Sequence, residues 1–175
     1  MTQRAYQPDP DFGRVRDLLV ETFPRFFELS NWRIERWNYC RYFVAPFFGD
    51  PDPAASAACI RYWEETTRIW EDAAGRICGV VNIEAPAEWH PEYNEVWIQR
   101  RPDADAPLDE MLAYAEDTFP HPKTRVVTVH ANENDTVLSS ALATRGYVRD
   151  AEPSESDAEY VITDLPQVTL PQGYT

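Results

Sequence analysis

Histidine and cysteine, the side chains most often used as metal ligands or as partners in nucleophilic catalysis, are few in this sequence and widely separated. None of the three histidines stands at a metal-ligand spacing from a cysteine or from another histidine. They are His90, His121 and His130. The cysteines show no CxxC spacing, and the GxSxG motif of a nucleophile elbow is missing. The sequence therefore predicts no metal site.

The cysteines also bear on the compartment. Cys40 and Cys78 stand in apolar stretches, which favours buried and unreactive thiols, whereas the surroundings of Cys59 leave its role open. Three cysteines cannot all pair with one another, so a reducing, cytoplasmic setting is the simplest interpretation. No apolar run reaches the roughly 20 residues of a membrane span, and the polar start does not resemble a signal peptide.

The charge balance narrows the choice of partners. Sixteen Lys and Arg residues stand against thirty Asp and Glu residues, a formal net charge of −14. Nucleic acids and anionic membranes are bound largely through positive charge, so neither is an expected partner. Amines and other cationic small molecules remain plausible, as do apolar protein surfaces.

The hydrophobic pattern alternates between helical and strand periods along the 175 residues. This predicts an α/β or α+β fold with a mixed sheet. The expected helices cover 10–23 (capped by Asp9), 31–45, 107–119 and 136–145 (ending at Gly146). The expected strands cover 4–7, 60–70, 76–83, 95–99, 125–130 and 160–164, with 60–83 forming a hairpin around a turn at 73–75.

Ten aromatic residues crowd into segment 23–48, more than a single core-facing stripe requires. Core packing accounts for about half of them. The others are typical of an interface with a second domain or another copy of the chain, or of a pocket wall that stacks on a cationic amine.

The stretch EVWIQRRP, followed by a loop and a helix and then by VVTVHANENDTVLSSALATRGYVRD, resembles the GNAT superfamily of acetyl-CoA-dependent N-acetyltransferases. The resemblance covers about residues 4–165, and a single domain is expected over 1–165. It implies a mixed, splayed sheet with helices on both faces. In that family a bulge in the fourth strand opens a cleft for the pantetheine arm, and amides at the following helix N-terminus hold the diphosphate.

The last residues carry a second resemblance. ITDLPQVTLPQGYT is similar to the linker of tandem GNAT proteins, in which such a motif opens a second acetyltransferase domain. Residues 166–175 are therefore expected to be a linker, and the chain to be the first half of a two-domain protein.

The region 102–110 departs from the family pattern. It contains no glycine, Pro107 removes one amide donor, and four carboxylates stand where a polyanion should bind. Among the residues that the resemblance assigns to the cofactor, Gln99, Arg100 and Arg101, the two arginines offset only part of this charge. Helix 136–145 also lacks the tyrosine that often protonates the departing thiolate, and has Leu142 at that position.

The resemblance does assign candidate proton acceptors. Glu95 matches a carboxylate that accepts a proton from the amine in some family members, and Glu84 is a weaker candidate. The alternative for each is a solvated carboxylate at a strand end. His130 either faces the acceptor cleft or is an ordinary hydrogen-bonded residue at the end of its strand. Amides near Gln99 are expected to polarise the thioester carbonyl.

Two functions follow from these expectations. In the first, the protein is an N-acetyltransferase that uses acetyl-CoA as cosubstrate, and this segment is a degenerate half that has lost its own CoA-binding loop. In the second, it is a non-catalytic GNAT-like domain that binds a partner domain or a small ligand.

Overall fold

The computed structural model describes residues 1–26, 29, 33–44, 52–85 and 95–150. Five strands form one sheet in chain order: β1 (Thr2–Ala5), β2 (Arg68–Glu71), β3 (Ile77–Ile83), β4 (Glu95–Arg100) and β5 (Thr128–His130). Neighbours are antiparallel from β1 to β4, and β4 and β5 are parallel. The expected α/β class with a mixed sheet is confirmed.

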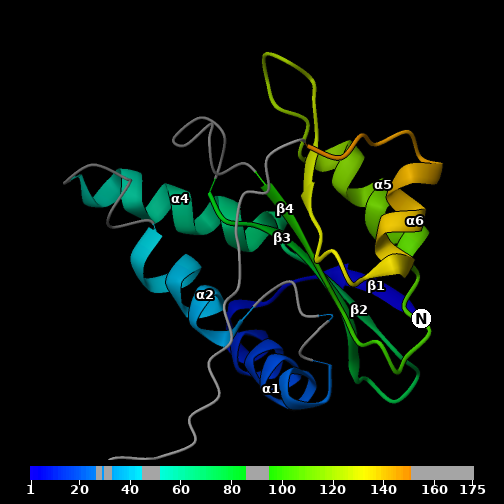
Figure 1. Cartoon of the computed structure of the whole chain (residues 1–175). Coiled ribbons are helices and arrows are strands. Elements are labelled where there is room, and N and C mark those ends of the chain that lie inside the picture. Colours follow the sequence, from blue (N-terminus) through cyan, green and yellow to red (C-terminus); the bar gives the residue numbers. More distant parts are fainter. Residues whose placement is uncertain (27–28, 30–32, 45–51, 86–94, 151–175) are drawn as a thin grey trace, which may run out of the picture.

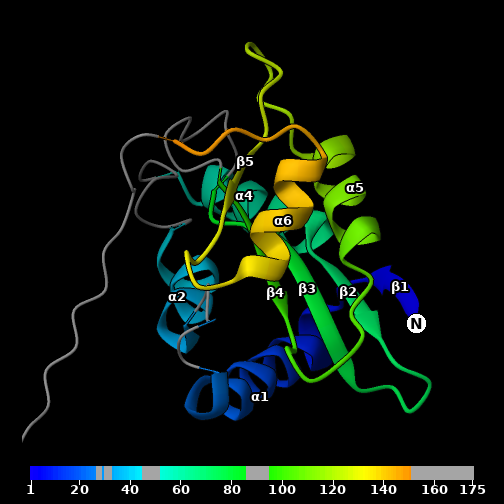
Figure 2. The same ribbon diagram turned by 45° about the vertical axis from the view of Figure 1, so that its right-hand side comes forward.

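Helices lie on both faces of this sheet (Figures 1 and 2). One face is covered by α1 (Pro8–Phe26), α2 (Ile34–Tyr39) and α4 (Pro53–Thr66), the other by α5 (Leu108–Thr118) and α6 (Thr136–Thr144). Each face has its own hydrophobic core, because alternate residues of a strand point to opposite sides. Trp97 belongs to the first core and Ile98 to the second.

Helix α1 begins as the sequence predicts. Asp9 has an extended backbone, so regular helix starts at Pro10, whose fixed φ suits a first helical position. The predicted end at Phe23, before Pro24, is three residues early, since α1 continues to Phe26. The helix predicted over 31–45 also differs from the observed one. Helix α2 ends at Tyr39, and the chain continues as the π-helix η2 (Cys40–Val44).

The predicted strand 60–70 is wrong over most of its length. Residues Pro53–Thr66 form helix α4, with Cys59 and Trp63 buried one turn apart on the same side. The Asp52 carboxylate caps this helix by accepting from the Ala54 amide at 2.9 Å. The hairpin is therefore limited to β2 and β3. Its turn at 73–75 is confirmed, and Gly75 has the positive φ of +76° that such a turn requires.

The second half follows the prediction more closely. Gly146 has φ +88° at the end of α6, where the Tyr147 amide donates to the Leu142 carbonyl at 3.1 Å, as in a Schellman motif. The predicted strand 125–130 is shorter, because only Thr128–His130 pair with β4 and Arg125 has a positive φ of 59°.

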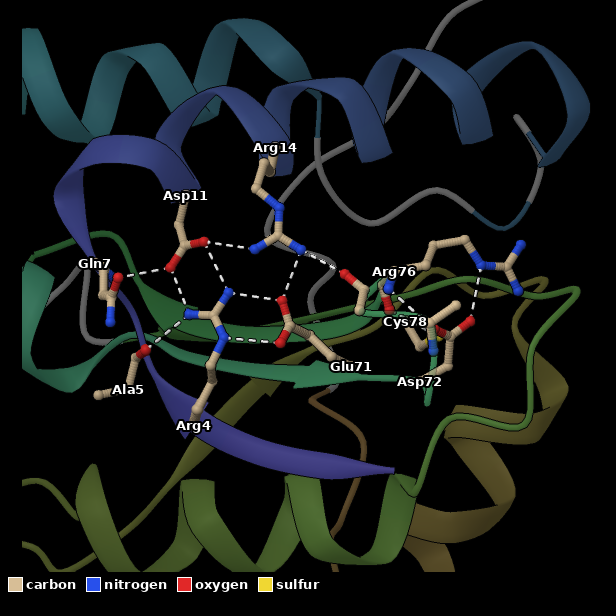
Figure 3. A network of polar contacts seen from close by, with 11 residues as sticks. Arg4, Ala5, Gln7, Asp11, Arg14, Glu71, Asp72, Arg76 and Cys78 are labelled. Carbon is tan, nitrogen blue, oxygen red and sulfur yellow. Dashed lines mark hydrogen bonds and ion pairs between the residues drawn. The ribbon is translucent and has the colours of Figure 1, made fainter.

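A partly buried ionic network around Asp11 attaches the first half of α1 to the sheet (Figure 3). Asp11 accepts hydrogen bonds from the guanidinium groups of Arg4 and Arg14 and from the amide of Gln7. Glu71 of β2 accepts from the same two arginines. Strand β1, helix α1 and strand β2 therefore share two cations and two carboxylates.

The crowded aromatics of segment 23–48 divide between core and surface. Trp37 is fully buried against Trp63 of α4, with ring centroids 4.7 Å apart. Tyr42, by contrast, is 65% exposed, and Phe43 is also exposed. Core packing thus explains part of this segment, as predicted.

Several expectations fall outside the described residues. They concern His90, the strand at 160–164 and the linker 166–175. Within the described ranges, no helix combines the length and the apolar character needed to cross a bilayer. All three cysteines are free and buried, and burial raises the pKa of Cys59 to about 11. The expectation of unreactive thiols at Cys40 and Cys78 agrees with their burial.

Candidate functional site

Strand β5 pairs along its whole length, but only with the first three residues of β4. Glu95, Val96 and Trp97 lie opposite Thr128, Val129 and His130, and the pairing ends there. The last three residues of β4, Ile98–Arg100, still pair with β3 but have no paired residue in β5. The pairing of β4 with β5 thus ends at Trp97, and the separation of the two strands beyond this point is called the opening below. Figure 2 shows the two strands side by side.

The splay arises without the expected bulge in β4. The register between β3 and β4 is continuous from Gly79 opposite Arg100 to Ile83 opposite Val96. The irregularity of this sheet lies instead between Trp70 and Glu71 of β2. The opening is therefore due to the shortness of β5.

The backbone direction of β4 fixes which amides point into the opening. The Arg101 amide donates to the Cys78 carbonyl at 2.9 Å, so the pairs that exchange hydrogen bonds with β3 are those of Arg101, Gln99 and Trp97. The N–H and C=O groups of Ile98 and Arg100 consequently point toward β5. The amides near Gln99 that were expected to polarise a carbonyl are thus those of its neighbours, and not that of Gln99 itself.

A small cavity of about 20 Å³ lies at this end of β4, enough for one water molecule. Its walls are mostly apolar and come from α1, and its polar residues come from β4 and from the start of α6. The lining residues are Leu18, Leu19, Thr22, Phe26, Leu29, Ile98, Gln99, Arg100, Pro102 and Asp135.

Two donors of β4 are buried at this cavity. Gln99 is 5% exposed, and its Nε2 has no hydrogen-bond partner within the described part of the chain. The same holds for Nε of Arg100. The other end of the Arg100 guanidinium pairs with Asp135, which also caps α6 by accepting from the Leu138 amide at 3.0 Å. Arg100 is therefore engaged within the protein and does not present a free charge.

Arg101, the second cationic candidate, is 2% exposed and is held by two carboxylates. Its Nη1 and Nη2 donate to both oxygens of Glu21 at 2.9 and 2.5 Å, and its Nε donates to Asp103 at 3.3 Å. These contacts lower the pKa of Glu21, chiefly through the hydrogen bonds from Arg101. The positive charge expected to bind phosphate is thus compensated by α1 and by the turn itself.

The turn after β4 closes on itself. The amides of Ala104, Ala106 and Leu108 donate to carbonyls two or three residues earlier, at 2.8 to 3.2 Å. Pro107 precedes α5 without a capping side chain. Since a diphosphate needs several outward amides and excess positive charge, the residues of this turn do not fit one.

The proton-acceptor candidates gather at the opposite end of β4. Glu95 Oε2 lies 3.7 Å from Nδ1 of His130 on the neighbouring strand. The His130 ring stacks on Trp97, with centroids 4.0 Å apart. Both Glu95 and His130 are partly exposed, so a ligand can approach them.

Glu84 forms a structural ion pair. Its carboxylate is buried and accepts from Arg36 of α2 at 2.8 Å, and the Arg36 guanidinium lies 4.9 Å from the centre of the Trp97 ring. Of the two candidate bases, only Glu95 remains accessible.

Sequence reasoning missed that Glu21 pairs with Arg101 and Asp135 with Arg100. An Asn or Asp cap before helix 136–145 was expected from the sequence, and Asp135 is that cap. Nothing in the local sequence links Glu21 to Arg101, 80 positions away. The position that the resemblance gives to a tyrosine holds Leu142, which is buried in the core beneath α6.

Tyr147 packs against the same core, and burial, reinforced by Glu116, raises its pKa to about 12. Among the described residues, no group of three or more His, Cys, Asp or Glu is placed to hold a metal ion.

Comparisons with known proteins identify no relative of this chain. No family model matches the chain, and neither the curated proteins nor the solved structures yielded a match. The class of protein must therefore be inferred from the fold and the site.

Proposed function

We propose that the chain is a GNAT-like domain whose diphosphate turn has closed, so that this domain does not itself bind acetyl-CoA. The turn 101–107 carries the proposal. The amides of Ala104 and Ala106 donate within the turn, and the guanidinium of Arg101 is paired with Glu21 and Asp103. A diphosphate would have to displace two carboxylates to reach that one cation.

The kinship with acetyltransferases is supported by the sheet. Antiparallel strands β1 to β4 are followed by a helix and a parallel fifth strand, and the last pair separates after three residues. The GNAT resemblance implies such an opening. In this proposal acetyl transfer to an amine is the activity of the GNAT superfamily, and the role of this domain is to bind a partner domain.

The binding role is supported by the exposed aromatics that follow α2. Tyr42 and Phe43 are exposed on η2 although neighbouring Cys40 is buried. Aromatic side chains at a surface are typical of protein interfaces. We propose that this surface contacts a partner domain, either a second GNAT domain or another copy of the chain.

Isothermal titration calorimetry with acetyl-CoA tests the proposal. We expect no binding heat, and micromolar affinity would contradict the closed turn. The double variant Asp105→Asn/Asp109→Asn then separates two causes. Regained affinity would make carboxylate repulsion the main obstacle, whereas unchanged behaviour would assign the loss to the inward amides of the turn.

A second candidate function is acetyl transfer by this domain, and the Glu95–His130 contact favours it. A carboxylate 3.7 Å from an imidazole can accept a proton from a bound amine and pass it on. The test is thiol release from acetyl-CoA in the presence of amines. Activity lost in Glu95→Gln and kept in Glu133→Gln, a change at an exposed carboxylate, would establish this function over the first.

A further inference from the structure

Helix α1 forms one wall of the cavity at the end of β4. Leu18, Leu19, Thr22 and Phe26 line it from α1, and Gln99 lines it from β4. The Nε2 of Gln99 has no hydrogen-bond partner among the described residues. A buried donor without a partner is costly in a site with room for a single water. Any larger ligand that uses this donor requires α1 to move.

The two halves of α1 are fastened in different ways. The first half is held by Asp11, which is 1% exposed and accepts from Arg4 and Arg14 (Figure 3). The second half is held by Glu21, whose side chain is 54% exposed, and by Arg25, which pairs with Asp103 at 3.1 Å and is also exposed. The Arg25–Asp103 pair lies at the surface, so it contributes little and is screened by salt. In the Glu21–Arg101 pair the guanidinium is buried, and the exposed Glu21 carboxylate is the partner that water and salt can reach.

The helix itself is weaker in its second half. Pro24 has no amide hydrogen, so the hydrogen bond that residue 24 would donate to the Val20 carbonyl is missing. The opposite side of the cavity offers no such weakness. There Arg100 and Asp135 are both largely buried, and Asp135 also caps α6.

We propose that the second half of α1, residues 18–26, is a lid over the cavity, and that the pairing of Glu21 with Arg101 holds it closed. The lid covers the opening at the end of β4 that the proposed function treats as the cleft of a GNAT-like domain. The inference rests on the proposed function only for that assignment. In the closed form the Glu21 carboxylate takes the bidentate position that an anionic ligand would take on Arg101. Opening exposes Gln99 and releases this guanidinium together.

Thiol labelling measures the opening directly. Gln99→Cys places a thiol in the cavity, and Asn82→Cys places one on the same face of neighbouring β3, where Asn82 is fully buried and does not line the cavity. The native cysteines are buried and give a slow background. We expect Gln99→Cys to react at least ~10-fold faster, because local opening outruns global unfolding.

The Glu21 contact is tested in the same assay. Adding Glu21→Gln, or about 1 M NaCl, is expected to accelerate labelling of Gln99→Cys without affecting Asn82→Cys. The matched control is Glu116→Gln, which removes a carboxylate paired with Arg145 between α5 and α6. Equal labelling rates at the two positions, or no response to Glu21→Gln, would overturn the lid.

Hydrogen exchange of the wild-type chain provides a measurement that needs no new cysteine. Residues 18–26 are expected to exchange faster than residues 10–17, and Glu21→Gln to increase the difference. Equal protection along α1 would contradict the proposal. Binding of acetyl-CoA in calorimetry would instead refute the closed diphosphate turn and leave the lid standing, so the two failures are distinguishable.

Discussion

Trp37 joins three helices through its ring contacts. Its indole lies 5.7 Å from the Phe12 ring of α1 and 4.7 Å from the Trp63 ring of α4, measured between centroids, and its Nε1 donates to the Phe12 carbonyl at 3.2 Å. The indole thus fills the space between α1, α2 and α4 on this face of the sheet.

Replacing Trp37 by alanine is expected to lower the free energy of unfolding by about 3–5 kcal/mol, because it leaves a cavity among closely packed rings. Tyr42→Ala, an aromatic deletion at the exposed end of the same segment, is expected to cost less than about 0.5 kcal/mol. Urea unfolding followed by circular dichroism measures both. Similar losses for the two variants would show that the division between core and surface is wrong.

Asp135 has two separable tasks, capping α6 and neutralising Arg100. Asp135→Ala removes both, and we expect a loss of about 2–4 kcal/mol, since a helix cap is lost and a largely buried charge is left unpaired. Asp135→Asn keeps a capping oxygen and should retain part of this stability. Thermal unfolding of both variants distinguishes the tasks, and identical losses would mean that the cap contributes nothing.

At the scale of elements, the missed helix α4 is instructive. The signal was available, because Asp52 before Pro53 repeats the arrangement of Asp9 before Pro10 that correctly predicted the start of α1. The following residues were assigned to a strand because apolar side chains alternate near Trp63 and continue into β2. A short alternation of apolar residues fits a strand and the edge of a helix equally well. The Asp52–Pro53 cap was therefore the better guide, and it indicates a helix.

The ionic network makes the attachment of β1, α1 and β2 dependent on pH. Burial alone would raise the pKa of Asp11, but hydrogen bonds from Arg4, from the Gln7 amide and from Arg14 outweigh it, and the pKa lies below its ordinary value. The pKa of Glu71 is lowered first by hydrogen bonds from Arg4 and then by those from Arg14.

Carboxyls with lowered pKa values stabilise the fold above their unfolded pKa of about 4, and this stability is lost as the pH falls through the folded values. We therefore expect the free energy of unfolding to decrease steeply below about pH 5. Asp11→Asn should flatten this dependence, whereas Asp109→Asn, at a carboxylate that is 90% exposed, should leave it unchanged. Denaturant unfolding at several pH values provides the measurement, and parallel curves for all three proteins would rule out the network as the cause.

At the scale of the whole molecule, the helices and strands were predicted from the sequence better than the contacts between them. Periodicity, caps and Gly146 placed α5, α6, β3 and β4 within a few residues. The contacts that close the site, Arg101 with Glu21 and Arg100 with Asp135, join residues 80 and 35 positions apart. Such pairings depend on how α1 and α6 pack on the sheet, and no local pattern encodes them.

The acidity of the turn was predicted from its composition, and the structure adds the reason why it matters. The carboxylates repel an anion, and Glu21 and Asp103 also occupy the buried cation that would attract one. The inward hydrogen bonds of Ala104, Ala106 and Leu108 take three further amide donors away from an anion. The closed turn therefore follows from charge and backbone direction together.

The most direct measurement of this claim is an acetyl-CoA titration monitored by the amide resonances of residues 101–110 in a ¹⁵N-labelled chain. The closed turn predicts that these resonances keep their positions at millimolar ligand. Saturable shifts confined to the turn and to the first residues of α5 would contradict it, because they would place a diphosphate at a turn whose buried cation is already paired with Glu21 and Asp103.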